Sequence, residues 1–189
     1  MYFVTICTKN RECYFGEIVE AQCLASPFER LASLQPTEIG KVAENEWYKT
    51  VELRRDMNLK LGEFMVMPNH VHGIIMIGEN KYNAQRDVGC GGKGRDAMYS
   101  GQDATHRVST VAGYKNQFAP QSKNLASIIR GYKSAVTTYA RKNNIEFDWQ
   151  PRFHEHIIRS MDDYTKIADY IINNPIKWQN DKFFRSAQL

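Results

Sequence analysis

Two of the five histidines in the chain, His70 and His72, stand one residue apart in the segment MPNHVHGIIMI. Residues two apart on a β-strand project from the same face, so this apolar segment would carry both imidazoles side by side. Two neighbouring neutral imidazoles are half of a metal site, and the remaining ligands must come from elsewhere in the chain. The pair alone is weak evidence, because strand histidines are more often satisfied by a backbone carbonyl.

A tyrosine and an asparagine near the carboxyl terminus could complete such a site. In DDYTKIADYIINNP, a helix that buries its apolar stripe leaves Tyr170 and Asn174 together on its flank, four residues apart. A phenol that attacks a phosphodiester needs the charge on the phosphate oxygens neutralised, which a divalent cation does as a Lewis acid and template. The phenol has a pKa of about 10 and leaves readily, so a DNA 3′-hydroxyl can reverse a phosphotyrosine bond without ATP.

A sheet and several helices must bring these residues together, and the hydrophobic pattern predicts both. β-Branched and aromatic residues predict strands at 2–8, 59–67, 71–77 and 153–159, while NRECYFGEI after the first strand predicts a turn or hairpin. Near-helical spacing predicts helices at 37–54, 124–143 and from Ser160 to about Pro175. The order β-α-β-β-α-β-α predicts an α+β fold, a ferredoxin-like sandwich with a mostly antiparallel sheet and helices packed against it.

Length and composition suit one soluble globular domain, since the 189 residues include 42% hydrophobic and 24% charged residues. No apolar run is long enough to cross a bilayer, no signal peptide is expected, and no C-x-x-C pair is present, which together favour a cytoplasmic protein with free thiols. From about residue 80 to 123 the pattern collapses around GCGGKGR, which predicts a flexible basic loop within a single domain, 1–189. The net charge of +4 permits an acidic partner such as DNA.

Three segments in this order, MPNHVHGIIMI, WQPRFHEHIIR and DYIINNPIKW, resemble the single-tyrosine HUH transposases, in particular the branch of REP-associated tyrosine transposases. The opening YFVTICTKNRECYFGEI is similar to that family as well, so the resemblance covers the chain except the loop at 80–123. It implies a ferredoxin-like enzyme that nicks single-stranded DNA and joins it through a 5′-phosphotyrosine. It further implies His70 and His72 as metal ligands, Tyr170 as the nucleophile, and Asn174 as a helix-borne third ligand.

The same resemblance implies single-stranded or hairpin-bearing (REP-like) DNA as the partner, no membrane, and either a monomer or a homodimer. Mg²⁺ or Mn²⁺ suits such a nuclease better than Zn²⁺, because open octahedral positions are needed. The candidates for contacts with the DNA backbone are Arg130, Lys133, Arg152 and Lys177. A second H-x-H pair, His154 and His156, is expected to be structural, with His156 a candidate to orient a metal ligand.

Other functions remain open at this point. A replication-initiator-like nickase would use the same chemistry, and a catalytically silent descendant of a transposase would bind structured DNA without cutting it. A β-barrel metalloenzyme of cupin type is suggested by the two H-x-H pairs, but the long helices at 37–54 and 124–143 count against it. The competing nucleophile Tyr132 lies on the apolar stripe of the helix 124–143 and is expected in the core.

Overall fold

The computed structural model describes residues 1–22, 30–83 and 123–184, so most of the loop expected at about 80–123 lies outside the described residues. The main sheet has four strands, β1 (Tyr2–Cys7), β4 (Leu59–Met67), β5 (His70–Ile77) and β6 (His154–Ile157), in the order β4-β5-β1-β6. All neighbouring pairs in this sheet are antiparallel. Together with the intervening helices this order is ferredoxin-like, and the predicted α+β class is confirmed.

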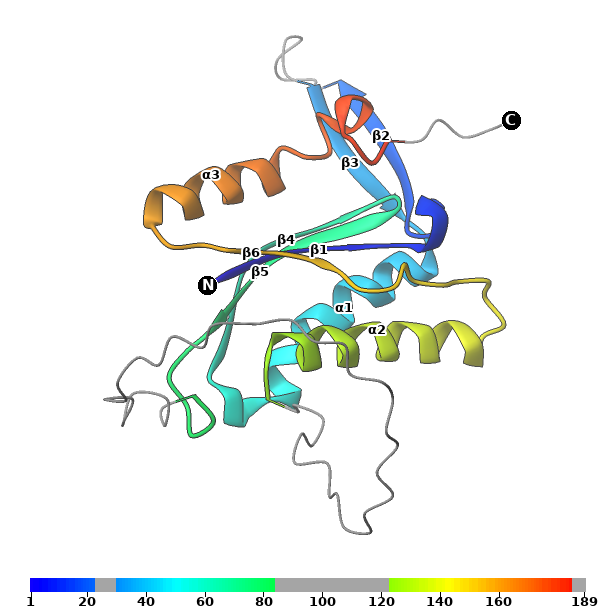
Figure 1. The fold of residues 1–189 in the computed structure, drawn as a ribbon. Coiled ribbons are helices and arrows are strands. Elements are labelled where there is room, and N and C mark those ends of the chain that lie inside the picture. The colour runs from blue at the N-terminus through cyan, green and yellow to red at the C-terminus, as the bar shows by residue number, and fades with distance from the viewer. Residues whose placement is uncertain (23–29, 84–122, 185–189) are drawn as a thin grey trace, which may run out of the picture.

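Three helices cover the two faces of this sheet (Figure 1). Helices α1 (Glu38–Leu53) and α2 (Leu125–Lys142) lie on one face, and α3 (Met161–Ile172) lies on the other. Their amino-terminal caps are the residues that the sequence indicated: the side chain of Thr37 accepts from the backbone N–H of Gly40, and that of Ser160 accepts from Asp163. No helix within the described ranges is long and apolar enough to cross a membrane.

The larger part of the core lies between the sheet and the pair α1 and α2. Val4, Ile6, Val71 and Ile75 from the strands meet Trp47, Ile128 and Tyr132 from the helices. Tyr132 is 2% exposed, which confirms its expected place in the core. Gly73 lets the Trp47 ring approach β5, because a Cβ at this glycine would overlap the ring.

The opposite face of the sheet packs against α3. Its buried residues Ile74, Ile158 and Ile171 form a second cluster, joined by the partly buried Phe3 and Met65. Because side chains alternate along β5, the residues of even number from His70 to Ile74 share this face. The fold therefore places both histidines of β5 beneath the segment that contains α3 and the chain that follows it.

A two-stranded antiparallel sheet of β2 (Gly16–Gln22) and β3 (Arg30–Pro36) stands apart from the main sheet. The sequence predicted only a turn or hairpin at residues 10–18 and no strand at 30–36. The sequence RLASLQP of β3 contains no β-branched residue, so it lacks the usual strand signal. Figure 1 shows this ribbon rising from one end of the sheet, beside the last described part of the chain.

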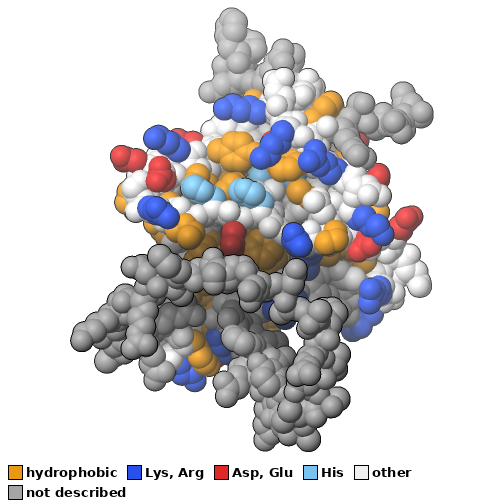
Figure 2. All heavy atoms as spheres, in the orientation of Figure 1, with side chains coloured by type: hydrophobic (Ala, Val, Ile, Leu, Met, Phe, Trp, Pro, Cys, Tyr) orange, Lys and Arg blue, Asp and Glu red, His pale blue; other side chains and the backbone are white. Residues whose placement is uncertain are grey.

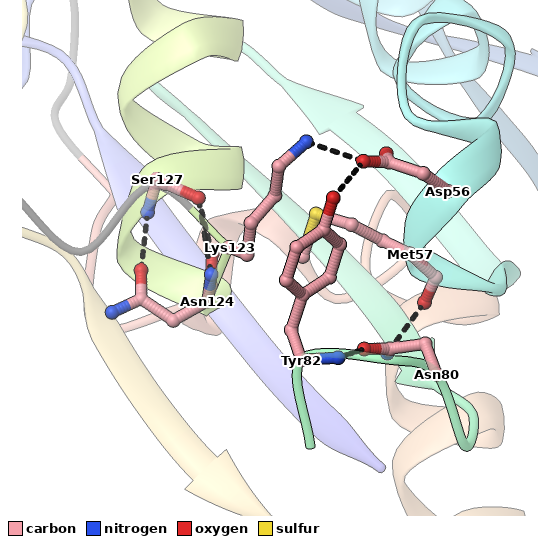
Figure 3. Close-up of polar contacts among 7 residues, drawn as sticks. All are labelled: Asp56, Met57, Asn80, Tyr82, Lys123, Asn124 and Ser127. Carbon is pink, nitrogen blue, oxygen red and sulfur yellow. Dashed lines mark hydrogen bonds and ion pairs between the residues drawn. The ribbon is translucent and has the colours of Figure 1, made fainter. Parts of the chain in front are cut away.

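Three short 3₁₀ turns complete the described structure: η1 (Lys9–Arg11), η2 (Arg55–Met57) and η4 (Trp178–Asn180). In η2, Asp56 accepts hydrogen bonds from the Tyr82 hydroxyl and from Lys123 Nζ, each at 2.6 Å (Figure 3). These two bonds hold the pKa of Asp56 at about 2. Tyr82 and Lys123 lie close to the two ends of the described chain on either side of residues 84–122, and these bonds hold those two ends together.

Candidate metal centre

The two histidines predicted from the sequence lie together at the start of β5. Their Nε2 atoms are 2.9 Å apart, and the two side chains are 0% and 1% exposed. Val71 between them points into the core on the other face of the sheet, as the alternation of a strand requires. The expected pairing of His70 and His72 on one face is therefore present.

The opposite nitrogen of each imidazole is fixed by a neighbouring side chain. His70 Nδ1 lies 2.8 Å from Asn69 Oδ1, and His72 Nδ1 lies 2.9 Å from Thr5 Oγ1. Asn69 Nδ2 donates to the carbonyls of Arg11 and Phe183, so its oxygen must face His70 and accept a hydrogen bond from Nδ1–H. This bond leaves a lone pair on His70 Nε2, and it orients the ring as the partners of metal-binding histidines do.

Both imidazoles are uncharged at physiological pH. Burial, with a smaller contribution from the nearby Lys182 and Arg11, lowers the pKa of His70 to about 3. Burial also holds the pKa of His72 well below its usual value, with His70 as the next largest cause. Neutral imidazole is the form that binds a metal, so the environment suits ligands and not proton carriers.

The two Nε2 atoms lie close enough to bind one cation together, since nitrogen ligands stand about 2.1 Å from such an ion. Asp181 lies beside them, and one ligand atom from each of His70, His72 and Asp181 falls within 4.8 Å of the others. This group could hold a metal ion.

Asn174, expected on the flank of a helix, follows the end of α3 at Ile172 and is 2% exposed. Its Nδ2 donates to Asp181 Oδ2 at 3.3 Å, whereas its Oδ1 has no hydrogen-bond partner among the described residues. An unsatisfied buried oxygen costs about 1–3 kcal/mol. A cation beside Asp181 would bind this oxygen if the amide turned over, so the residues present fit a divalent metal.

Tyr170 brings its hydroxyl to the same cluster from α3. The oxygen lies 3.3 Å from His72 Nε2 and 3.3 Å from Asp181 Oδ2, while 38% of the side chain is exposed. The ring stands edge-on to Phe3, at 6.2 Å between centroids. Burial and the Asp181 carboxylate raise the pKa of Tyr170 to about 12, so the phenol is protonated at neutral pH.

The chain after η4 covers the imidazoles. The Phe183 ring lies 4.6 Å from that of His70, measured between centroids. Two hydrogen bonds hold the main chain of this segment in place. Asn69 Nδ2 donates to the carbonyl of Phe183 at 2.8 Å, and Arg11 Nη1 donates to the carbonyl of Lys182 at 3.0 Å. Asp181, which the sequence reasoning missed, is thus part of a segment that both supplies a ligand atom and covers the site.

The other predicted residues lie at different distances from this cluster. Lys177 lines a hollow of about 530 Å³ together with Tyr170 and Asn174. Arg130 lies on α2, across the sheet from the histidines. His156 is exposed on β6 and has no hydrogen bond to either imidazole among the described residues.

The side chains that orient the two imidazoles are Thr5 and Asn69, and His156 does not contribute. Lys133 and Arg152 meet beside β6, where Lys133 Nζ donates to the Arg152 carbonyl at 3.1 Å. The sequence offered one signal for Asn69, its place in the Pro68-Asn69 turn directly before His70. It offered none for Thr5 or Asp181, because only the fold brings them to the histidines.

No protein-family model matches the chain. An uncharacterized protein of Haemophilus influenzae is 34% identical to it over 184 residues, which are 97% of this chain and 84% of that protein. The chain belongs to the family of that Haemophilus protein. A solved structure of a REP-associated tyrosine transposase bound to a REP hairpin is 19% identical, with a TM-score of 0.46. The match covers 93% of this chain, which spans 66% of the length of that one.

Proposed function

We propose that the protein is a metal-dependent single-stranded DNA endonuclease and transposase that cleaves and rejoins DNA through a 5′-phosphotyrosine. One observation carries the proposal: the Tyr170 hydroxyl lies 3.3 Å from His72 Nε2, within the cluster that could hold a metal. About a hundred residues separate these side chains in sequence. Hairpin-bearing, REP-like DNA is the substrate that the resemblance of the three sequence segments implies.

Each residue of the cluster has a role in this reaction. His70, His72, Asp181 and the turned amide of Asn174 are the proposed ligands, with Mg²⁺ or Mn²⁺ as the cation. Bound by these residues, such a cation would neutralise charge on the scissile phosphate, act as a Lewis acid and favour ionisation of the nearby phenol. Tyr170 supplies the oxygen that attacks phosphorus, and its exposed edge lets the proton pass to solvent.

The cleavage step forms one bond to phosphorus and breaks one. A bond forms between the Tyr170 oxygen and phosphorus, and the bond from phosphorus to the 3′-oxygen of the preceding nucleotide breaks. The released 3′-oxygen takes up a proton and becomes a free hydroxyl. Attack by a 3′-hydroxyl on the phosphotyrosine reverses the step, so the bond energy is retained and no nucleotide cofactor is needed.

A second function, binding of structured DNA without cleavage, is favoured by one observation. His70 is 0% exposed, and Phe183 lies against its ring. In this arrangement no phosphate oxygen can reach the Nε2 atoms, so cleavage requires the segment around Phe183 to move away. A protein in which the segment never moves would bind DNA without cutting it.

The test is incubation with labelled single-stranded hairpin DNA from the flanks of the protein's own gene. Cleavage should require Mg²⁺ or Mn²⁺, stop on chelation, and be abolished in His70→Ala. His156→Ala is the matched control, because this histidine is exposed and, within the described part of the chain, forms no hydrogen bond with the cluster. Cleavage that survives both EDTA and His70→Ala contradicts the metal assignment, and hairpin binding without any cleavage favours the second function.

A further inference from the structure

A second hollow, of about 430 Å³, lies beside the candidate metal centre, over β1 and the loop that enters β6. Three of the residues that line it are cations, Arg11, Arg152 and Lys182, and none of its lining residues carries a carboxylate. The ion pairs found among the described residues involve none of these three cations. The wall of the hollow therefore carries positive charge, with Asp181 beside Lys182 as the neighbouring acid.

Figure 2 shows the face of the molecule on which β6 lies. Histidine side chains are exposed in the middle of this face, and Lys and Arg side chains gather above and to the right of them. In the same orientation Figure 1 shows β6 running across the front. This exposed face thus carries several basic side chains near its histidines, together with a few acidic ones, and an extended anionic ligand can lie along it.

The backbone of this region holds the two arginines in an unusual conformation. Five non-glycine residues in the described ranges have positive φ, and three of them are asparagines, which tolerate it. The other two are Arg11, at 59°, and Arg152, at 67°, and both line the hollow. Residues held in this way cost free energy and gather at binding and catalytic sites.

A half-buried lysine fixes the loop that carries Arg152. Lys133 Nζ donates to the carbonyls of Gln150 and Arg152, at 2.6 Å and 3.1 Å. Burial lowers the pKa of Lys133. Because two carbonyls take up its single ammonium group, Lys133 supports the loop and leaves Arg152 to contact a ligand. Arg11 donates only Nη1 to a carbonyl, that of Lys182, so its other guanidinium N–H groups can still contact a ligand.

The hollow adjoins the metal centre directly. Thr5 of β1 lines it and stands opposite His72 on one side and His154 on the other in the strand register. The Thr5 hydroxyl also contacts His72 Nδ1. Two strand spacings, about 10 Å, separate β5 from β6. A single strand of nucleic acid is therefore long enough to span this hollow and the metal centre, once the segment around Phe183 has moved.

We infer that this hollow binds backbone phosphate of single-stranded DNA next to the scissile phosphate, through Arg11, Arg152 and Lys182. The inference rests on the proposed function and adds the path of the strand and the residues that hold it. Guanidinium groups suit this role because they donate in a fork that matches phosphate oxygens. Phe153 in the wall offers a ring on which a base can stack.

Fluorescence anisotropy with a labelled unstructured oligothymidylate tests the inference, at several salt concentrations and in EDTA so that cleavage has no influence. Arg11→Gln, Arg152→Gln and Lys182→Gln should each weaken binding roughly three- to tenfold and lower the slope of log K against log salt by about 0.7. Arg152→Lys should restore most of the slope. Lys60→Gln is the control, because Lys60 is an exposed cation on β4, at the far edge of the sheet.

Three outcomes would overturn the inference in distinguishable ways. If the wild type binds the strand and the three variants match Lys60→Gln while keeping the wild-type melting temperature, the hollow is not the phosphate site although the proposed function stands. If deoxythymidine monophosphate displaces the strand at micromolar concentration, the hollow binds a free nucleotide instead. If the wild type binds no single-stranded DNA at all, both the inference and the proposed function fail.

Discussion

Asn69 and Thr5 decide what the two imidazoles of β5 can do. Each binds the Nδ1 side of one ring, which turns the two Nε2 atoms toward each other at 2.9 Å. Neither side chain belongs to the H-x-H pattern itself, yet without them the rings could rotate. The preorganisation of the site is therefore a property of its supporting residues as much as of the histidines.

The buried neutral histidines make folding stability depend on pH. The pKa of His70 falls from 6.5 to about 3 on folding, and that of His72 also falls well below 6.5. Because the folded-state pKa values are depressed, the stability is present above pH 6.5 and is lost as pH falls toward 3. Lowering the pH from 7.5 to 5.5 should therefore reduce the free energy of unfolding by about 1.4 kcal/mol for each of the two histidines.

Urea unfolding at these two pH values, with EDTA present, checks this expectation. The free energy of unfolding should fall in the wild type, and by about half as much in His70→Gln, which lacks one of the two titrating groups. His156→Gln should behave as the wild type, because His156 is exposed. Equal free energies at the two pH values in the wild type would show that the imidazoles are not held neutral by burial.

Substitution of Asp181 tests which residues bind the metal ion. Removing a charged ligand should weaken Mn²⁺ binding at least as much as the loss of an orienting partner does, by roughly 10- to 100-fold. Asp181→Ala should show this in calorimetric titration with Mn²⁺, and Asp162→Ala, an exposed acid at the start of α3, should not. Unchanged Mn²⁺ affinity in Asp181→Ala would remove Asp181 from the ligand set and leave Asn174 as the oxygen donor.

At the scale of elements, the position of β5 depends on how closely α1 approaches it. Gly73, next to His72, leaves room for the Trp47 ring of α1, and a Cβ there would overlap that ring. Gly73→Ala should therefore lower the free energy of unfolding by about 1–3 kcal/mol, the usual cost of overpacking a core. Urea unfolding measures this loss of stability. Gly78→Ala is not a suitable control, because a Cβ at Gly78 would come similarly close to the Asn58 side chain.

Gly131→Ala offers the better comparison for that experiment. The added Cβ at Gly131 would meet the end of the flexible Arg54 side chain, which can move, and α2 gains a stronger helix former. A loss of stability in Gly73→Ala no larger than in Gly131→Ala would contradict the proposed packing of Trp47 on β5.

The elements that the sequence predicted well are those with strong local signals. Strand β4 has the predicted bounds. Helices α1 and α2 begin directly after their capping residues Thr37 and Asn124, which are the first residues of the predicted segments 37–54 and 124–143. The strand β3 was missed because its sequence is not typical of a strand, and it is held by pairing with β2. Local preference therefore identified the main sheet and its helices but not this ribbon.

The site could be predicted only in the part that local spacing defines. His70 and His72 share a face because a strand alternates, and Tyr170 lies exposed on its helix as the stripe of α3 indicated. Asn174 was expected on that helix, but α3 ends before it and a tight turn buries it. Asp181 lies more than a hundred residues after the histidines, and no local spacing links such residues.

At the scale of the whole molecule, the segment 181–183 lies between two hollows. One, of about 530 Å³, is lined by Tyr170 and Asn174, and the other, of about 430 Å³, by Arg11 and Arg152, while Lys182 lines both. The imidazoles lie beneath the segment that separates them. Movement of this segment would join the hollows into one path across the metal centre, with the nucleophile at one end and the cations at the other.

The covalent intermediate is the most direct test of the central claim, that Tyr170 attacks DNA at this metal centre. Protein incubated with 3′-labelled hairpin DNA and Mn²⁺ should carry the label through denaturing electrophoresis, and 5′-labelled DNA should give a shorter free fragment. Tyr170→Phe keeps the ring that packs against Phe3 but lacks the oxygen, so it should bind DNA and form no adduct. An adduct that persists in Tyr170→Phe, or its absence from the wild type on every hairpin tested, would contradict the account.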